Sequence, residues 1–126
     1  SVHLPYNKDT DHLIGADVFN KMKPDSILVC TARGKIVDED ALYEALVSHK
    51  IGGAGLDVYA VEPLPTDSKL IGLDNIVLTP HVSSQTYESI WATYKKGVDI
   101  VADFFAGKEL DRSDLLNPDY AQNARK

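Results

Sequence analysis

Short apolar runs alternate with segments of helical periodicity along this chain. The runs that favour β-strands lie at residues 2–4, 27–30, 53–59 and 75–79. The segments with apolar positions three or four apart, which favour helices, lie at residues 14–23, 38–50 and 86–106. This alternation predicts βαβ units, with about four parallel strands and flanking helices. The unbroken apolar run at residues 27–30 predicts a strand buried on both faces.

Two of the predicted helices carry end signals. Asp38 is a good N-cap, and Val37 can close over Leu42 as a hydrophobic staple. The last helix has one apolar face, and Gly107 follows it as a C-cap. The polar residues 108–126 then predict an extended tail.

Composition narrows the class of protein. The chain has 126 residues, room for one modest core, and a formal net charge of −6 without a Lys/Arg cluster, which argues against nucleic acid as a partner. A single cysteine, Cys30, gives neither a disulfide framework nor a thiolate metal site and favours the cytoplasm. The apolar runs of the chain are too short for a membrane span. The missing initiator Met and strand-like start suggest a piece of a longer protein.

Three polar side chains follow predicted strands, where parallel sheets bind ligands. Arg33, Asp57 and His81 each lie at or just past a strand's carboxyl end, so they should converge on one rim. Each also has a plain structural interpretation: a solvated arginine, an aspartate capping a turn, and a histidine that only hydrogen-bonds. Glu62, in a proline-containing loop, could simply face solvent. The coincidence of a cation, a carboxylate and an imidazole at one edge favours a functional site.

The segments "HLPYNKDTDHLIGADVFNKMKPDSILVCTARGKIVDEDALYEAL", "GGAGLDVYAVEPLP" and "NIVLTPHVSSQT" strongly resemble the D-isomer-specific 2-hydroxyacid dehydrogenases. The resemblance runs from about Val2 to Gly107, in the carboxyl-terminal half of that family's NAD-binding domain. It implies half of a Rossmann-like, doubly wound α/β fold over residues 1–107, followed by a polar tail over 108–126. It also implies an NAD-dependent oxidoreductase that acts on a D-2-hydroxy or 2-keto acid, with NADP left open.

The resemblance assigns catalytic roles to three residues. Arg33 would hold the substrate carboxylate and the C2 oxygen, which suits a planar guanidinium. His81 would be the general acid and base, and Glu62 would hydrogen-bond its imidazole and fix its tautomer. Among the cofactor contacts, Asp57 would bind the nicotinamide carboxamide. The implied cofactor-binding residues are His3, Leu4, Pro5, Thr31, Ala32, Arg33, Asp57, His81, Ser83 and Ser84.

The sequence also departs from the family. Cys30 replaces the usual Asn, serines stand at 83 and 84 where Gly is commoner, and "GGAG" at 52–55 does not continue into the G-x-G-x-x-G turn that holds a pyrophosphate. We therefore expect these residues alone to be inactive and to bind NAD weakly, with a newly exposed sheet edge at residues 2–4 that favours self-association and a homodimer. The alternatives are an NAD-sensing, corepressor-like module of the same family and an independent small α/β protein.

Overall fold

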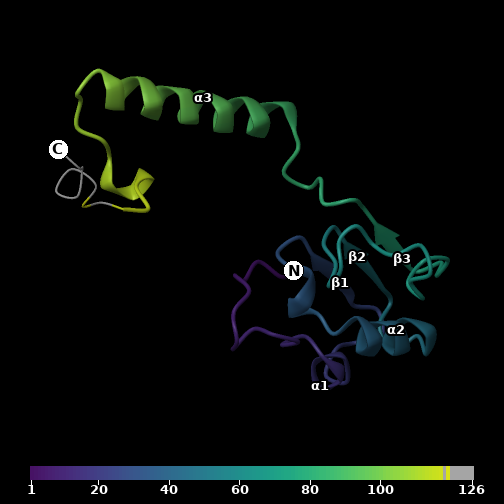
Figure 1. Ribbon diagram of the computed structural model, residues 1–126. Helices are drawn as coiled ribbons and strands as arrows, with labels where there is room; N and C mark the ends of the chain where they lie inside the picture. The colour runs from purple at the N-terminus through teal and green to yellow at the C-terminus, as the bar shows by residue number, and fades with distance from the viewer. Residues whose placement is uncertain (118, 120–126) are drawn as a thin grey trace. The chain divides into compact units, whose positions relative to one another are not determined.

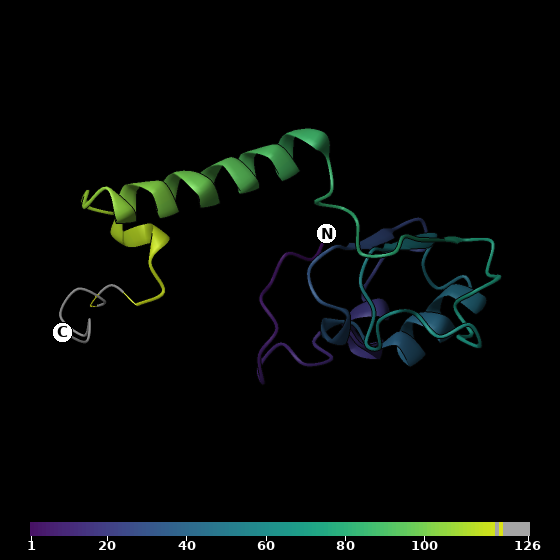
Figure 2. The ribbon, with the colours of Figure 1, turned by 45° about the horizontal axis from the view of Figure 1, so that its top comes forward.

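The structure is a computed structural model that describes residues 1–117 and 119. It consists of two compact units, Ser1–Ser83 and a second that begins at Ser84. Figures 1 and 2 show the chain from two directions. The first unit contains the sheet and every candidate residue up to Ser83, so the site can be described within it.

A three-stranded parallel sheet forms the centre of the first unit. Its strands β1 (Ile27–Cys30), β2 (Gly53–Leu56) and β3 (Ile76–Leu78) lie side by side in chain order. The prediction of about four strands is wrong by one, because the run at residues 2–4 forms only a single parallel bridge between Val2 and Cys30. Beyond Val2 the pairing stops: the His3 ring bonds the Ser1 hydroxyl, and Pro5 has no backbone N–H to donate.

The helix α1 (Ala16–Phe19) is much shorter than the predicted segment 14–23. Ile14 is held in an extended bridge with Val37, and its N–H donates to the carbonyl of Ile36 at 3.0 Å. At the other end, Pro24 disfavours helical geometry in the residue before it. Long-range pairing and a proline therefore limit α1 to about one turn.

The helix α2 (Glu39–Val47) begins where its sequence predicts. Asp38 accepts hydrogen bonds from the backbone N–H groups of Asp40 and Ala41 at 3.1 and 3.0 Å, as an N-cap does. A 3-10 turn, η1 (Gly34–Ile36), connects β1 to this helix. The β1-η1-α2 connection thus places Arg33 at the point where the sheet ends and the turn begins.

Helices α1 and α2 cover the same face of the sheet in both views (Figures 1 and 2). The core between these helices and the sheet is made of buried side chains that include Phe19, Leu28, Cys30, Ile36, Leu42, Leu46, Ile51 and Leu56.

The prediction that β1 is buried on both faces is wrong. Its burial alternates, with Ile27 67% and Val29 39% exposed, because the two helices of the first unit cover only the face that carries Leu28 and Cys30.

The second unit contains a long helix, α3 (Tyr87–Phe105), close to the predicted bounds of 86–106. Thr86 caps its start by accepting from the N–H of Ser89, and Gly107, with φ at +70°, ends it. The N–H groups of Gly107 and Lys108 bond the carbonyls of Phe104 and Asp103, which is the Schellman arrangement.

The segment predicted as a tail is not wholly extended, because the turn η2 (Arg112–Asp114) lies within it and is capped by Asp111. Residues 118 and 120–126 of that segment lie outside the described residues. None of the described helices is both long enough and apolar enough to cross a membrane.

Candidate active site at the carboxyl ends of the strands

Parallel pairing brings the ends of the three strands to one edge. Leu56 pairs with Cys30 on one side and Leu78 on the other. The ladder continues one residue further, since the N–H of Asp57 donates to Cys30 and that of Thr79 donates to Leu56, both at 3.0 Å. Asp57 and Thr79 are consequently neighbours at this edge. The predicted convergence of polar groups on the rim is present, with the Asp57 carboxylate buried beneath it.

The Arg33-Gly34 pair shapes one wall of the edge. Arg33 is exposed, and its Nη1 donates to the carbonyl of Ala32 at 2.7 Å. A Cβ atom at Gly34 would lie 1.8 Å from the carbonyl carbon of Tyr59, which is far inside van der Waals contact. Glycine is required here because the backbone of the segment after β2 packs directly on it. This packing brings that segment alongside Arg33.

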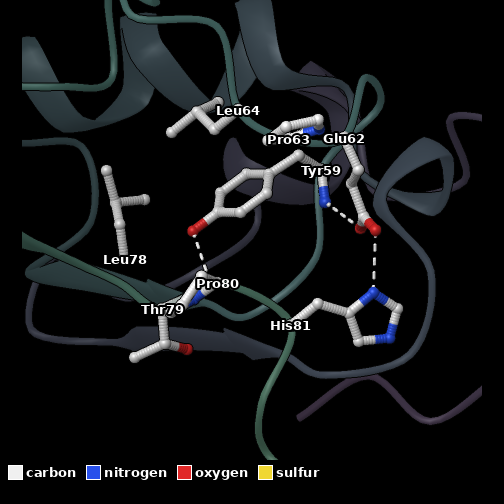
Figure 3. A pocket seen from close by; sticks show the side chains of 8 residues that line it. All are labelled: Tyr59, Glu62, Pro63, Leu64, Leu78, Thr79, Pro80 and His81. Carbon is white, nitrogen blue, oxygen red and sulfur yellow. Dashed lines mark hydrogen bonds and ion pairs between the residues drawn. The ribbon is translucent and has the colours of Figure 1, made fainter.

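His81 and Glu62 form a hydrogen-bonded pair (Figure 3). Nδ1 of His81 lies 2.8 Å from Oε2 of Glu62, and Oε1 of Glu62 accepts from the N–H of Tyr59 at 3.0 Å. The bond to His81, and then the one from Tyr59, hold the pKa of Glu62 below its usual range despite partial burial. The hydrogen bond expected between Glu62 and the imidazole is therefore present, and the glutamate is ionised at neutral pH.

Asp57 is buried, with 3% of its surface exposed. Its Oδ1 accepts from the Thr79 hydroxyl and, at 2.9 Å, from the N–H of Val82, and its Oδ2 accepts from the N–H of Ser83 at 2.9 Å. Burial by itself opposes ionisation, but the hydrogen bonds from Thr79, Ser83 and Val82 outweigh it and hold the pKa of Asp57 well below its ordinary value. The carboxylate of Asp57, which follows β2, therefore binds the turn that follows β3.

Two residues of the site were missed by sequence reasoning. The hydroxyl of Tyr59 donates to the carbonyls of Thr79 and Leu56, at 2.8 and 3.2 Å, and burial is the main reason that its pKa is raised. Thr79 in turn donates to Asp57. Figure 3 shows Tyr59 reaching from the Glu62 loop to Thr79. Their roles depend on the strand register, for which the sequence carried no signal.

Two crevices open at this edge and share a wall. The first has a volume of about 610 Å³ and is lined by His3, Leu4, Pro5, Tyr6, Thr31, Ala32 and Arg33. The second, of about 430 Å³, is lined by Tyr6, Arg33, Gly34, Lys35, Tyr59, Ala60, Glu62 and His81. Tyr6 and Arg33 line both. The guanidinium therefore stands between the crevice that contains His3 and Thr31 and the crevice that contains Glu62 and His81.

A further hollow of about 580 Å³ lies beside the His81–Glu62 pair (Figure 3). Its walls are mainly apolar and include Tyr59, Pro63, Leu64 and Leu78.

The two serines predicted to bind the cofactor do not line this hollow. The N–H of Ser83 donates to the carboxylate of Asp57. Ser84 belongs to the second unit, and its cofactor role stays a prediction.

Residues 1–83 match the sequence model described as "D-isomer specific 2-hydroxyacid dehydrogenase, NAD binding domain". The chain belongs to this family. The matched residues coincide with the first structural unit, and they include Arg33, Glu62 and His81. The resemblance inferred from the three sequence segments is thereby confirmed, as is the Rossmann-like α/β fold class.

Two similar proteins are named as hydroxypyruvate reductases, and a similar solved structure is that of a D-lactate dehydrogenase. Glyoxylate/hydroxypyruvate reductase B of Pectobacterium carotovorum is 44% identical over 117 residues, covering 93% of this chain and 36% of the relative. Hydroxypyruvate reductase of Thermotoga maritima is 47% identical over 113 residues, covering 87% and 35%. D-lactate dehydrogenase of Lactobacillus jensenii, solved with NAD+, has a TM-score of 0.78 and 34% identity, covering 85% and 36%. The chain spans about a third of the length of these relatives.

The first crevice fits the nucleoside end of a nicotinamide dinucleotide. Leu4, Pro5 and Ala32 offer apolar surface for a flat ring, and the hydroxyl of Thr31 and the imidazole of His3 can hydrogen-bond a ribose. The pyrophosphate-binding glycine turn is not encoded in these 126 residues. Within residues 1–117 and 119, no three His, Cys, Asp or Glu side chains are arranged to hold a metal ion.

Proposed function

We propose that this chain supplies the carboxylate-binding and proton-transferring groups of an NAD(P)-dependent D-2-hydroxyacid dehydrogenase. The observation that carries the proposal is the placing of Arg33 and His81 on one crevice, with Glu62 bonded to the imidazole. Family membership supports the reaction type. The names of its relatives support a small 2-keto acid such as glyoxylate or hydroxypyruvate as the substrate.

In this proposal Arg33 binds the carboxylate of the keto acid through its guanidinium fork. Nδ1 of His81 is engaged by Glu62, so Nε2 is the nitrogen that gives a proton to the carbonyl oxygen during reduction. In the reverse direction Nε2 takes the hydroxyl proton. Glu62 keeps the ring in one orientation and fixes its tautomer.

The nicotinamide cofactor, when bound, supplies or accepts the hydride at C2 of the substrate. His3, Leu4, Pro5, Thr31 and Ala32 would hold its nucleoside end in the first crevice, with Arg33 at the boundary. Ser83, Ser84, Asp57 and His81 complete the proposed set of cofactor contacts. Homodimer assembly and a cytoplasmic location stay predictions.

Turnover by the intact protein that contains these residues tests the proposal. Purified protein should oxidise NADH or NADPH in the presence of glyoxylate, hydroxypyruvate or pyruvate. His81→Ala should reduce kcat by about 10²- to 10⁴-fold, the usual contribution of a positioned acid or base. His49→Ala is a matched control, because His49 is also exposed and also has a positive φ, 51° against 56° for His81.

Equal activity in the two variants would overturn the assignment of His81. Cofactor binding without turnover of any of the three acids would instead favour the NAD-sensing module. That outcome would leave the family and the fold unchanged.

A further inference from the structure

The loop that carries Glu62 needs support from outside itself. Residues 57–63 follow β2 without forming a helix or a strand, and the bond from the Tyr59 N–H to Glu62 lies within this loop. The Glu62 side chain is 36% exposed, so close packing does not immobilise it. The position of its carboxylate beside His81 therefore depends on what holds the backbone of the loop.

Glu39 supplies such support from a different element. Its Oε1 accepts from the N–H of Ala60 at 2.6 Å, across 21 residues of sequence. Glu39 is half-buried and is the first residue of α2, a helix whose start is capped by Asp38. Because Asp38 accepts from the first-turn N–H groups of Asp40 and Ala41, the carboxylate of Glu39 is left to bind the loop.

Consecutive backbone amides of the loop bind two different carboxylates. The N–H of Tyr59 donates to Glu62 at 3.0 Å, and the N–H of Ala60 donates to Glu39. Hydrogen bonds to a carboxylate are stronger than those between neutral groups. The other oxygen of Glu62 lies 2.8 Å from Nδ1 of His81. A shift of the backbone at residues 59–60 would therefore move Glu62 relative to the imidazole.

The contacts that hold the loop come from the chain segment that also carries Arg33. Gly34 packs on the backbone of Tyr59, where a Cβ atom would lie 1.8 Å from the carbonyl carbon, and Glu39 binds the next residue, Ala60. Both belong to the β1-η1-α2 connection, which includes Arg33. The loop is thus fixed against the segment that supplies the proposed carboxylate anchor.

We propose that Glu39 is a positioning residue for Glu62 and, through Glu62, for His81. Its carboxylate holds the loop at Ala60, so that the imidazole and its glutamate partner keep their place on the Arg33 crevice. The inference rests on the proposed function for its kinetic consequences, and on the hydrogen bonds alone for the placement of the loop.

A carboxylate in the first turn of a helix also has a simpler role, since its charge stabilises the helix. Three substitutions separate this role from positioning. Glu39→Asp keeps the charge but is shorter by one methylene group, so its carboxylate falls short of Ala60. Glu39→Gln keeps the reach and a carbonyl acceptor but loses the charge. Glu39→Ala loses both.

Keto-acid reduction by the intact protein measures the effect on the site. We expect kcat to fall by about tenfold or more in Glu39→Ala and Glu39→Asp, because a small misplacement of a catalytic group slows the reaction strongly. Glu39→Gln should keep kcat within about threefold of wild type, and KM for the cofactor should change less than about twofold in all three. Glu44→Ala is the matched control, because Glu44 is an exposed residue of the same helix.

The placement of the loop has its own readout. Amide hydrogen exchange at Tyr59 and Ala60 should be faster in Glu39→Ala and Glu39→Asp than in wild type, because the loop opens more easily without the bond to residue 39. The ¹⁵N resonance of His81 Nδ1 at neutral pH should move in the same two variants. Glu39→Gln should resemble wild type in both measurements. A change in helix stability alone would not move that resonance.

Three outcomes would overturn the proposal. Wild-type kcat in Glu39→Asp, with a loss in Glu39→Gln, would mean that Glu39 acts through its charge at the start of α2. Wild-type exchange at Tyr59 and Ala60 in Glu39→Asp would mean that the bond does not hold the loop, and this variant decides the matter if Glu39→Ala does not fold. A lower kcat with an unchanged Nδ1 resonance would mean that the loss arises elsewhere.

The proposed function and the positioning can fail separately. Absence of keto-acid reduction in wild type would defeat the proposed function, while the exchange rates and the resonance would still decide the positioning.

Discussion

Oε2 of Glu62 lies 2.8 Å from Nδ1 of His81, and Oε1 of the same carboxylate accepts from the N–H of Tyr59 at 3.0 Å. Both oxygens of Glu62 are thus fixed, one by the segment that follows β2 and one by the turn that follows β3. Tyr59 also donates to the carbonyl of Thr79, and Asp57 accepts from Thr79, Val82 and Ser83, so several hydrogen bonds link the two segments. The imidazole is therefore positioned by hydrogen bonds between the segments that follow β2 and β3.

Glu62→Gln should shift the pH dependence of keto-acid reduction. The bonds from His81 and Tyr59 lower the pKa of Glu62, so the carboxylate is ionised at neutral pH. Glutamine keeps the shape without the charge. Wild type should consequently lose activity as the pH falls through the lowered pKa of Glu62, and the glutamine variant, which has no carboxylate to protonate, should lack that step. Superimposable profiles of kcat/KM would show that Glu62 does not act on His81.

Arg33→Lys should weaken the binding of the acid far more than that of the cofactor. Lysine keeps the positive charge but loses the two-pronged contact that guanidinium makes with a carboxylate. We expect KM for the keto acid to rise by about tenfold or more, with KM for NADH changing about twofold. Steady-state kinetics with both substrates varied measures the two constants. Equal increases would mean that Arg33 is not the carboxylate anchor.

Gly34→Ala should strongly destabilise the first unit. The added methyl would lie 1.8 Å from the carbonyl carbon of Tyr59, so the backbone of one segment must move. We expect a loss of about 3 kcal/mol or more in the free energy of unfolding, at the upper end for overpacking. Gly97→Ala is the matched control. Gly97 lies inside α3 with open space at its Cβ position, so alanine should stabilise that helix by about 0.5–1 kcal/mol. Urea unfolding compares the two.

Protonation of Asp57 should lower the free energy of unfolding of the protein in acid. Its pKa in the folded state is lowered well below the roughly 3.9 of an unfolded chain, so its stabilisation is complete above about pH 4 and is lost as the pH falls toward the folded value. Between about pH 4 and 2, Asp57→Asn should reduce the slope of unfolding free energy against pH by up to about 1.4 kcal/mol per unit. Urea titrations at several pH values would measure this slope. A variant with the wild-type slope would show that Asp57 takes up no proton on unfolding.

The 126 residues by themselves should bind NAD weakly and reduce no keto acid. They contain the proposed acid, base and carboxylate anchor but encode no glycine turn for the pyrophosphate. Calorimetry with NAD should give a dissociation constant well above the low-micromolar range. Tight binding by this chain would mean that the first crevice alone holds the cofactor.

Much of this protein was determined by signals within a few residues of one another. Asp38 and Thr86 begin their helices because a side-chain oxygen satisfies the nearest free N–H groups, and Gly107 ends α3 because glycine readily adopts a positive φ. The strand-end positions of Arg33 and His81 also followed from sequence, since the ends of parallel strands share an edge.

The tertiary structure decided the features that depend on pairing between distant segments. One-turn α1, the isolated bridge at Val2 and the open face of β1 all follow from which strands and helices pack together. The sequence left Asp57 open between capping a turn and contacting a ligand. The register of β2 with β3 puts its carboxylate beside Thr79 and the N–H groups around His81. A shift by one residue would turn it to the other face, so only the assembled sheet could give Asp57 its partners.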